Sequence, residues 1–101
     1  MSGIDDAPTA VAELYQNHPN PFNPTTTISF VLPERTRVTL EIYDVEGRLV
    51  RRLVSGVGEP GLNEIVWDGK DAKGRRVSSG VYLYRLSAGD EVMTKKMTVL
   101  K

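Results

Sequence analysis

The stretch RVTLEIYDVEGRLVRRLV, residues 37–54, decides the fold class of this chain. In its first half apolar and polar side chains alternate, and the apolar ones are Val38, Leu40 and Ile42. A period of two is typical of a strand that buries one face. Asp44 suits the first position of a type I turn, and Gly47 supplies a positive φ three residues later. The stretch therefore predicts a β-hairpin with a bulge at its turn.

The second arm of the hairpin, residues 49–54, also fits a helical spacing of apolar residues. Gly47 precedes this arm, and the stretch GVGEPG at residues 56–61 follows it. We interpret residues 56–61 as a six-residue loop, and together with Gly47 this loop favours a strand over a helix for the second arm.

Further strand patterns lie on both sides of the hairpin. Alternation recurs over residues 25–32 and 62–67. In residues 81–86 apolar side chains occupy both odd and even positions, which predicts a central strand covered on two faces. Residues 92–100 form the last strand, where a Lys-Lys pair is typical of an exposed edge. Seven short segments separated by turn signals predict an all-β fold, an immunoglobulin-like β-sandwich of about seven antiparallel strands.

The composition suits such a domain. A chain of 101 residues fits one domain, and Val, Ile and Thr number 24 against 5 Ala, which favours strands over helices. The absence of cysteine excludes disulfides, a thiolate zinc site and a cysteine nucleophile. Thirteen basic and thirteen acidic residues cancel, so the overall field that attracts nucleic acid is missing and no nucleic-acid partner is predicted.

The charges are nevertheless unevenly distributed. Residues 1–34 carry four acidic residues and no Lys or Arg, whereas residues 70–101 carry eight basic and three acidic residues. No apolar run approaches the roughly 20 residues that span a bilayer, so the chain is predicted not to cross a membrane. The acidic start also lacks the pattern of a signal peptide.

The chain is expected to divide into two parts. Residues 1–13 are small, polar and aperiodic, and they predict a linker from an upstream domain. Residues 14–101 predict the β-sandwich domain. Within it, the three prolines of residues 14–24 predict an ordered extended loop, because each proline fixes φ and removes a backbone donor.

The residue types argue against catalysis. His18 is the only histidine, no Gly-x-Ser-x-Gly is present, and the chain is predicted not to be an enzyme. Asp44, Asp68 and Asp71 offer oxygen ligands for a hard cation, but their spacing is not that of an EF-hand, and solvated turns are favoured. We therefore predict no metal, no catalytic residue and no cofactor.

The aromatic residues allow two interpretations. They could form a stacking platform for sugars or single-stranded nucleic acid, or they could pack in the core with their hydroxyls at its rim. The alternating positions favour the core. The residues concerned are Tyr43, Trp67, Tyr82 and Tyr84.

Several motifs carry a resemblance to a known family. They are YQNHPNPFNPTTTI at residues 15–28, LP at 32–33, IYDVEGRLV at 42–50, WDGKD at 67–71, GR at 74–75, SGVYLYR at 79–85 and KMTVLK at 96–101. In this order they resemble the C-terminal sorting domain (type A) of type IX secretion cargo. The resemblance covers residues 14–101.

That resemblance implies a folded secretion signal with an immunoglobulin-like β-sandwich fold. The implied partners are the outer-membrane type IX translocon, a sortase-like peptidase that cuts within residues 2–14, and a covalently linked upstream cargo domain. The implied location is the periplasm in transit, then the cell surface or the extracellular space. The implied translocon-recognition residues are Pro19, Asn20, Pro21, Gly80, Tyr82, Lys96, Val99 and Lys101.

One mechanism and two alternatives follow. We expect the last strand to dock on the translocon by backbone augmentation, so that deleting residues 97–101 stops export without unfolding the domain. The same motifs also resemble the Ig-like domain of the flagellar hook-capping protein, a structural assembly module, although the end at Lys101 favours a sorting signal. A carbohydrate-binding accessory module of a secreted hydrolase would lose its affinity in Trp67→Ala with the fold intact.

Overall fold

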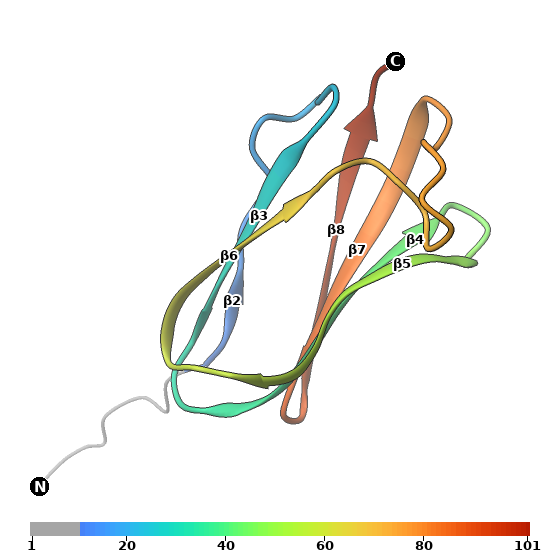
Figure 1. Ribbon diagram of the computed structural model, residues 1–101. Helices are drawn as coiled ribbons and strands as arrows, with labels where there is room; N and C mark the ends of the chain where they lie inside the picture. The colour runs from blue at the N-terminus through green and yellow to red at the C-terminus, as the bar shows by residue number, and fades with distance from the viewer. Residues whose placement is uncertain (1–10) are drawn as a thin grey trace, which may run out of the picture.

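The computed structural model describes residues 11–101, which form two antiparallel sheets packed face to face (Figure 1). The three-stranded sheet has the order β2-β3-β6 and the four-stranded sheet the order β5-β4-β7-β8. The prediction of an all-β, immunoglobulin-like sandwich of seven antiparallel strands is confirmed. The strands are β2 (Glu13–Leu14), β3 (Thr26–Leu32), β4 (Thr36–Asp44), β5 (Leu49–Gly58), β6 (Gly61–Trp67), β7 (Gly80–Ala88) and β8 (Glu91–Val99).

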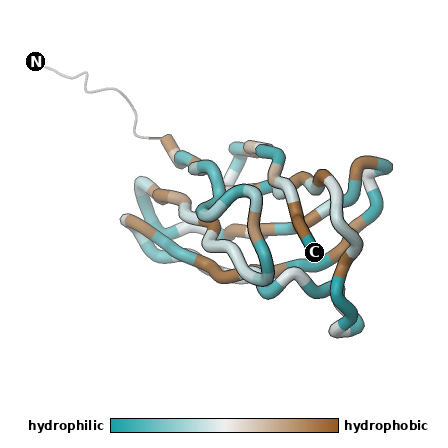
Figure 2. The backbone as a smooth tube through the Cα atoms, turned by 90° about the horizontal axis from the view of Figure 1, so that it is seen from above, coloured by the Kyte–Doolittle hydropathy of each residue, from teal (hydrophilic) through white to brown (hydrophobic). Residues whose placement is uncertain are grey.

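The core lies between the sheets and follows the predicted parity. Figure 2 shows hydrophobic and hydrophilic residues succeeding one another along the strands, as one buried face per strand requires. The β4 side chains expected to point inward are all buried, and so are every second residue of β3 and β7. The buried apolar side chains of these three strands are Ile28, Phe30, Leu32, Val38, Leu40, Ile42, Tyr82, Tyr84, Leu86 and Ala88.

The hairpin of β4 and β5 is confirmed, and its second arm is a strand. The Gly47 N–H donates to the Asp44 carbonyl over 3.0 Å, and Gly47 has a φ of +85°. The register of the two strands shifts between Leu40 and Glu41 and again between Ile42 and Tyr43. These irregularities twist the β5 edge, which protects it from pairing with another chain.

The predicted six-residue loop at residues 56–61 is wrong. β5 continues to Gly58 and β6 begins at Gly61, so two residues connect the sheets. Gly58 does not mark a turn but a close approach, because a Cβ there would lie 2.6 Å from the Leu32 Cδ1 atom. The glycine thus serves the packing of the two sheets against each other.

The prediction that residues 81–86 are covered on two faces is also wrong. β7 lies between β4 and β8, as a central strand should, but Val81 on its outer face is 43% exposed. A sandwich of two sheets covers only the inner face of each sheet, so the apolar residues at the odd-numbered positions of β7 face outward.

Ten residues of the predicted linker 1–13 lie outside the described part of the chain. Of the remaining residues, Ala12 is buried and Glu13 pairs with Val31 as the first residue of β2. The folded unit therefore includes at least residues 12 and 13. No helix in the part that the structure describes is long and apolar enough to cross a bilayer.

The sequence Asp-x-x-Gly-Arg occurs twice and builds the same turn twice. The Asp44 Oδ1 atom accepts the backbone N–H groups of Glu46 and Arg48, each over 2.9 Å. The Asp71 Oδ1 atom accepts those of Lys73 and Arg75 in the same way. The backbone N–H of Arg48, above all, lowers the pKa of Asp44, and that of Arg75 lowers the pKa of Asp71.

These two turns predict a dependence of stability on pH. A carboxyl whose pKa is lowered by folding stabilises the fold above its unfolded pKa, roughly 4, and this contribution is lost as the pH falls through the folded value. We expect the urea midpoint to fall from pH 7 to pH 3, and to fall less in an Asp44→Asn/Asp71→Asn variant. Glu34→Gln/Asp90→Asn is the charge-matched control, and an equal fall in both variants contradicts the assignment.

Candidate recognition surface

The segment that precedes β3 lies along the outer edge of β8 and runs parallel to it. We call residues 12–22 the strap. At its start the Ala12 N–H donates to the Glu91 carboxylate over 3.3 Å, and further along the Gln16 Nε2 atom donates to the Lys96 carbonyl over 2.7 Å. In Figure 1 the strap continues from β2 to a loop beside the arrowhead of β8.

The end of the strap binds the end of β8 through the backbone. The Asn20 Oδ1 atom accepts the Thr98 N–H over 2.9 Å. The Phe22 N–H donates to the Thr98 carbonyl over 3.1 Å, and the Phe22 carbonyl accepts the Leu100 N–H over 3.0 Å. Phe22 and Val99 thereby form a parallel bridge. The proline-rich loop expected from the sequence is thus ordered by pairing with the last strand.

A buried polar network fixes the strap from behind. Asn17 is 2% exposed, and its Nδ2 atom donates to the Thr26 hydroxyl over 2.9 Å and to the Pro19 carbonyl over 3.2 Å. The Tyr84 hydroxyl accepts the Asn17 N–H over 2.8 Å and donates to the Tyr15 carbonyl over 2.7 Å. Most of the strap has no ladder of its own, so these side chains satisfy its backbone groups.

The Tyr84 hydroxyl remains a donor over the whole physiological range of pH. Burial raises the pKa of Tyr84 to about 12, although the bond from the Asn17 N–H acts in the opposite direction. The contact between β7 and the strap therefore does not depend on pH near neutrality.

The structure gathers the predicted recognition residues at one end of the sandwich. Gly80 is opposite Val99 in the register of β7 and β8, and the Lys101 N–H donates to the Ser79 hydroxyl over 3.0 Å. Six of the predicted residues are exposed, and we call them the end surface. They are Pro19, Asn20, Pro21, Gly80, Lys96 and Lys101.

The other two predicted residues, Tyr82 and Val99, belong to the core. They are 7% and 5% exposed, respectively, and the Tyr82 hydroxyl donates to the Ser78 carbonyl over 2.8 Å. Their side chains support the end surface from below and are not presented on it.

β8 is an edge strand, as expected, but its edge is largely occupied. The strap forms hydrogen bonds with the carbonyl of Lys96, both backbone groups of Thr98 and the N–H of Leu100. Because outward-facing backbone groups alternate along a strand, those of Val92 and Thr94 face away from β7, and no strand of residues 11–101 pairs with them. Augmentation over residues 96–100 is therefore excluded unless the strap leaves, which corrects the expected docking mechanism.

Sequence reasoning missed the residues that hold the strap. These are Gln16, Asn17, Phe22 and Thr26. One signal was available: polar side chains placed among prolines have to satisfy backbone groups that prolines cannot pair. Their partners in β7 and β8, up to 80 positions away, left no local trace.

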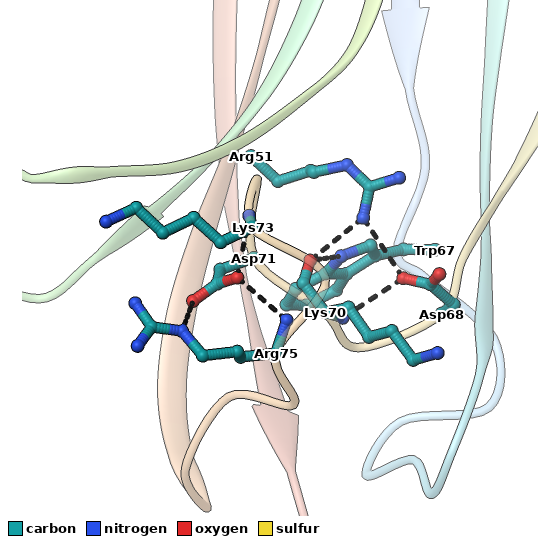
Figure 3. Close-up of polar contacts among 7 residues, drawn as sticks. All are labelled: Arg51, Trp67, Asp68, Lys70, Asp71, Lys73 and Arg75. Carbon is teal, nitrogen blue, oxygen red and sulfur yellow. Dashed lines mark hydrogen bonds and ion pairs between the residues drawn. The ribbon is translucent and has the colours of Figure 1, made fainter.

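Three of the four aromatic residues, Trp67, Tyr82 and Tyr84, lie in the core, whereas Tyr43 lies on the outer face of β4. Trp67 is fully buried, with its ring centroid 5.6 Å from that of Phe22 and 6.0 Å from that of Tyr82. Its indole N–H donates to the Lys70 carbonyl over 2.9 Å (Figure 3). The carbohydrate-binding alternative requires Trp67→Ala to leave the fold intact, and the burial of this side chain in the core argues against that alternative.

The aspartates of the turn after β6 are engaged within the protein. The Asp68 Oδ1 atom accepts the Lys70 N–H over 3.0 Å and lies 3.2 Å from an Arg51 guanidinium nitrogen (Figure 3). Asp71 faces Arg75 in the same view. Within residues 11–101 no group of three or more His, Asp or Glu residues is arranged to hold a metal ion. His18 is exposed, and its backbone pairs with Thr27.

Two solved structures from Porphyromonas gingivalis are similar to this chain. The first is dimeric latent PorU, with 29% identity and a TM-score of 0.75 over 97% of this chain and 10% of that chain. The second is PorZ, an essential surface component of the type IX secretion system, with 25% identity and a TM-score of 0.62 over 87% of this chain and 11% of that chain. The chain thus spans about a tenth of the length of each. No curated protein sequence matches it.

FlgD from P. aeruginosa shares the fold, with 23% identity and a TM-score of 0.60 over 88% of this chain and 66% of that chain. The FlgD Ig-like domain family matches residues 19–91, a range that ends where β8 begins. Because this match spans well over half of the sequence, the chain belongs to the FlgD Ig-like domain family.

Proposed function

We propose that this domain is a secretion signal of the type IX system and performs no reaction itself. It directs an attached cargo protein through the outer-membrane translocon, and a sortase-like peptidase then removes it. In transit it lies in the periplasm, and afterwards at the cell surface or outside the cell.

The observation that carries the proposal is the joining of the strap to the end of β8. Two motifs far apart in the sequence, around Pro19 and around Lys96, form one exposed surface with a fixed shape. Preorganised surfaces lose little conformational entropy when a partner binds them. The similarity to PorU and PorZ, at 29% and 25% identity, supports a place in the type IX system.

The proposal is tested with a reporter fusion. A signal peptide and a fluorescent protein are placed ahead of residues 1–101 in a bacterium that has this export machinery. We expect the reporter to appear outside the cell, cleaved from the domain. We also expect Lys96→Glu/Lys101→Glu to keep most of it in the periplasm, because both charges on the end surface are reversed.

The matched control is Arg37→Glu/Lys73→Glu, which reverses two exposed charges outside the end surface. Thermal unfolding of all variants ensures that each is folded. A wild-type fusion that stays in the periplasm refutes the sorting function. Equal export of the two charge-reversed variants refutes the end surface as the recognised part.

A structural assembly module of the hook-cap type is the second candidate, and the family match over residues 19–91 favours it. The match omits most of β8, whereas the similarity to PorU extends over 97% of the chain. In the same fusion experiment a hook-cap module leaves the reporter inside the cell.

A further inference from the structure

The outer faces of the two sheets carry opposite charge. On the face of β2, β3 and β6 the ionised residues are Glu13 and Glu64, and the register gives this face no Lys or Arg. On the face of β5, β4, β7 and β8 the register places Glu41 among four basic residues. These four are Arg37, Arg52, Arg85 and Lys96.

Arg85 has no carboxylate partner on this basic face. The one acidic residue that the register places on this face, Glu41, already has two partners. Its carboxylate lies 2.8 Å from the Arg52 guanidinium and accepts a hydrogen bond from the Tyr43 hydroxyl over 2.7 Å. Arg85 instead stacks on the Tyr43 ring, with its Cζ atom 4.6 Å from the ring centroid, and donates to the Tyr43 hydroxyl. No ion pair of Arg85 occurs within residues 11–101.

A hollow of about 280 Å³ lies beside this guanidinium. Its lining comes from three strands and from the β4–β5 turn, and Lys96 is the neighbour of Leu83 across the β7–β8 pair. The stacked guanidinium is stiff and keeps donors free for an incoming anion. The lining residues are Tyr43, Gly47, Leu83, Arg85 and Thr94.

We propose that this hollow binds a carboxylate side chain from an acidic peptide segment of a partner protein. The guanidinium of Arg85 and the hydroxyl of Thr94 hold the carboxylate, and Leu83 and the exposed Leu49 contact apolar side chains on either side of it. The proposal does not rest on the sorting function, since none of the residues that line the hollow belongs to the end surface.

A peptide fits this face better than a dense polyanion does. The row across the sheet that holds Leu49, Tyr43 and Leu83 is largely apolar, and the next row places Glu41 beside Arg85. A phosphate or sulfate chain makes no favourable contact with the apolar side chains of Leu49 and Leu83, and the Glu41 carboxylate repels it. An extended segment with an acidic side chain at position i and an apolar one at i+2 matches both rows, because these two positions share one face and lie about 7 Å apart.

The proposal is tested by NMR titration of the ¹⁵N-labelled chain with a peptide of the repeat Leu-Ser-Glu-Ser, which places leucine and glutamate on the same face when extended. We expect shifts at the Arg85 Nε–H and the Thr94 amide, and about tenfold weaker binding in Arg85→Gln, because a charge-assisted bond is lost. Arg37→Gln removes an equal charge from the same face, away from the hollow, and is expected to bind like the wild type.

Arg85→Lys keeps the charge without the planar fork, and we expect it to bind more weakly than the wild type and more tightly than Arg85→Gln. The same peptide with glutamine in place of glutamate should not bind. Three outcomes overturn the proposal: no shift at Arg85, equal weakening by Arg37→Gln, or tighter binding of inorganic polyphosphate than of the acidic peptide.

Discussion

Trp67→Ala is expected to destabilise the domain by about 3–5 kcal/mol, the usual effect of removing a large buried aromatic side chain. The side chain is fully buried between Phe22 of the strap and Tyr82 of β7, so its loss leaves a cavity that adjoins both sheets. A domain of this size has a stability of roughly 5–15 kcal/mol, so the variant loses a large share of it. Urea denaturation followed by circular dichroism measures the change.

Val66→Ala is the matched control for this experiment. Val66 is the neighbour of Trp67 on β6 but points outward and is 62% exposed, so we expect a change below about 1 kcal/mol. Similar losses in the two variants would contradict the assignment of Trp67 to the core. They would reopen the possibility that the tryptophan serves binding.

Deletion of residues 97–101 is expected to abolish cooperative folding. The deletion removes the side chains of Met97 and Val99, which are 1% and 5% exposed, and the backbone groups that hold Phe22. Each buried apolar side chain of this size contributes about 2–5 kcal/mol when it is lost, and together they approach the stability of the domain. The expected outcome is a flat thermal transition and a collapsed amide spectrum.

A shorter deletion separates folding from recognition. Removing Leu100 and Lys101 deletes two exposed residues and two hydrogen bonds, from Leu100 to Phe22 and from Lys101 to Ser79. At about 1 kcal/mol per bond, this variant should remain folded. If the five-residue deletion unfolds at the wild-type temperature, β8 does not support the core as described. The expectation that deletion of residues 97–101 leaves the domain folded conflicts with the burial of Met97.

The strand pattern was readable because it is local. Alternation over residues 37–44 assigned Val38, Leu40 and Ile42 to the core, and all three are buried. The turn at Asp44 and Gly47 was equally local, since four consecutive residues specify its hydrogen bonds. The errors arose where one residue type serves two purposes. The local sequence around Gly58 favours a loop, but in the folded protein this glycine permits the close approach of Leu32.

The sequence by itself therefore determined the fold class and the parity of the strands, since both depend on neighbours along the chain. The residues of the end surface came from the family resemblance, and their role in recognition stays a prediction. Only the tertiary structure decided that the strap covers the edge of β8 and that Tyr82 and Val99 lie beneath the surface. It also decided that Glu41 binds Arg52 and that Arg85 forms no ion pair among the residues that the structure describes. These features depend on contacts between residues up to 80 positions apart, and such pairings are selected by packing and hydrogen bonding in the folded state.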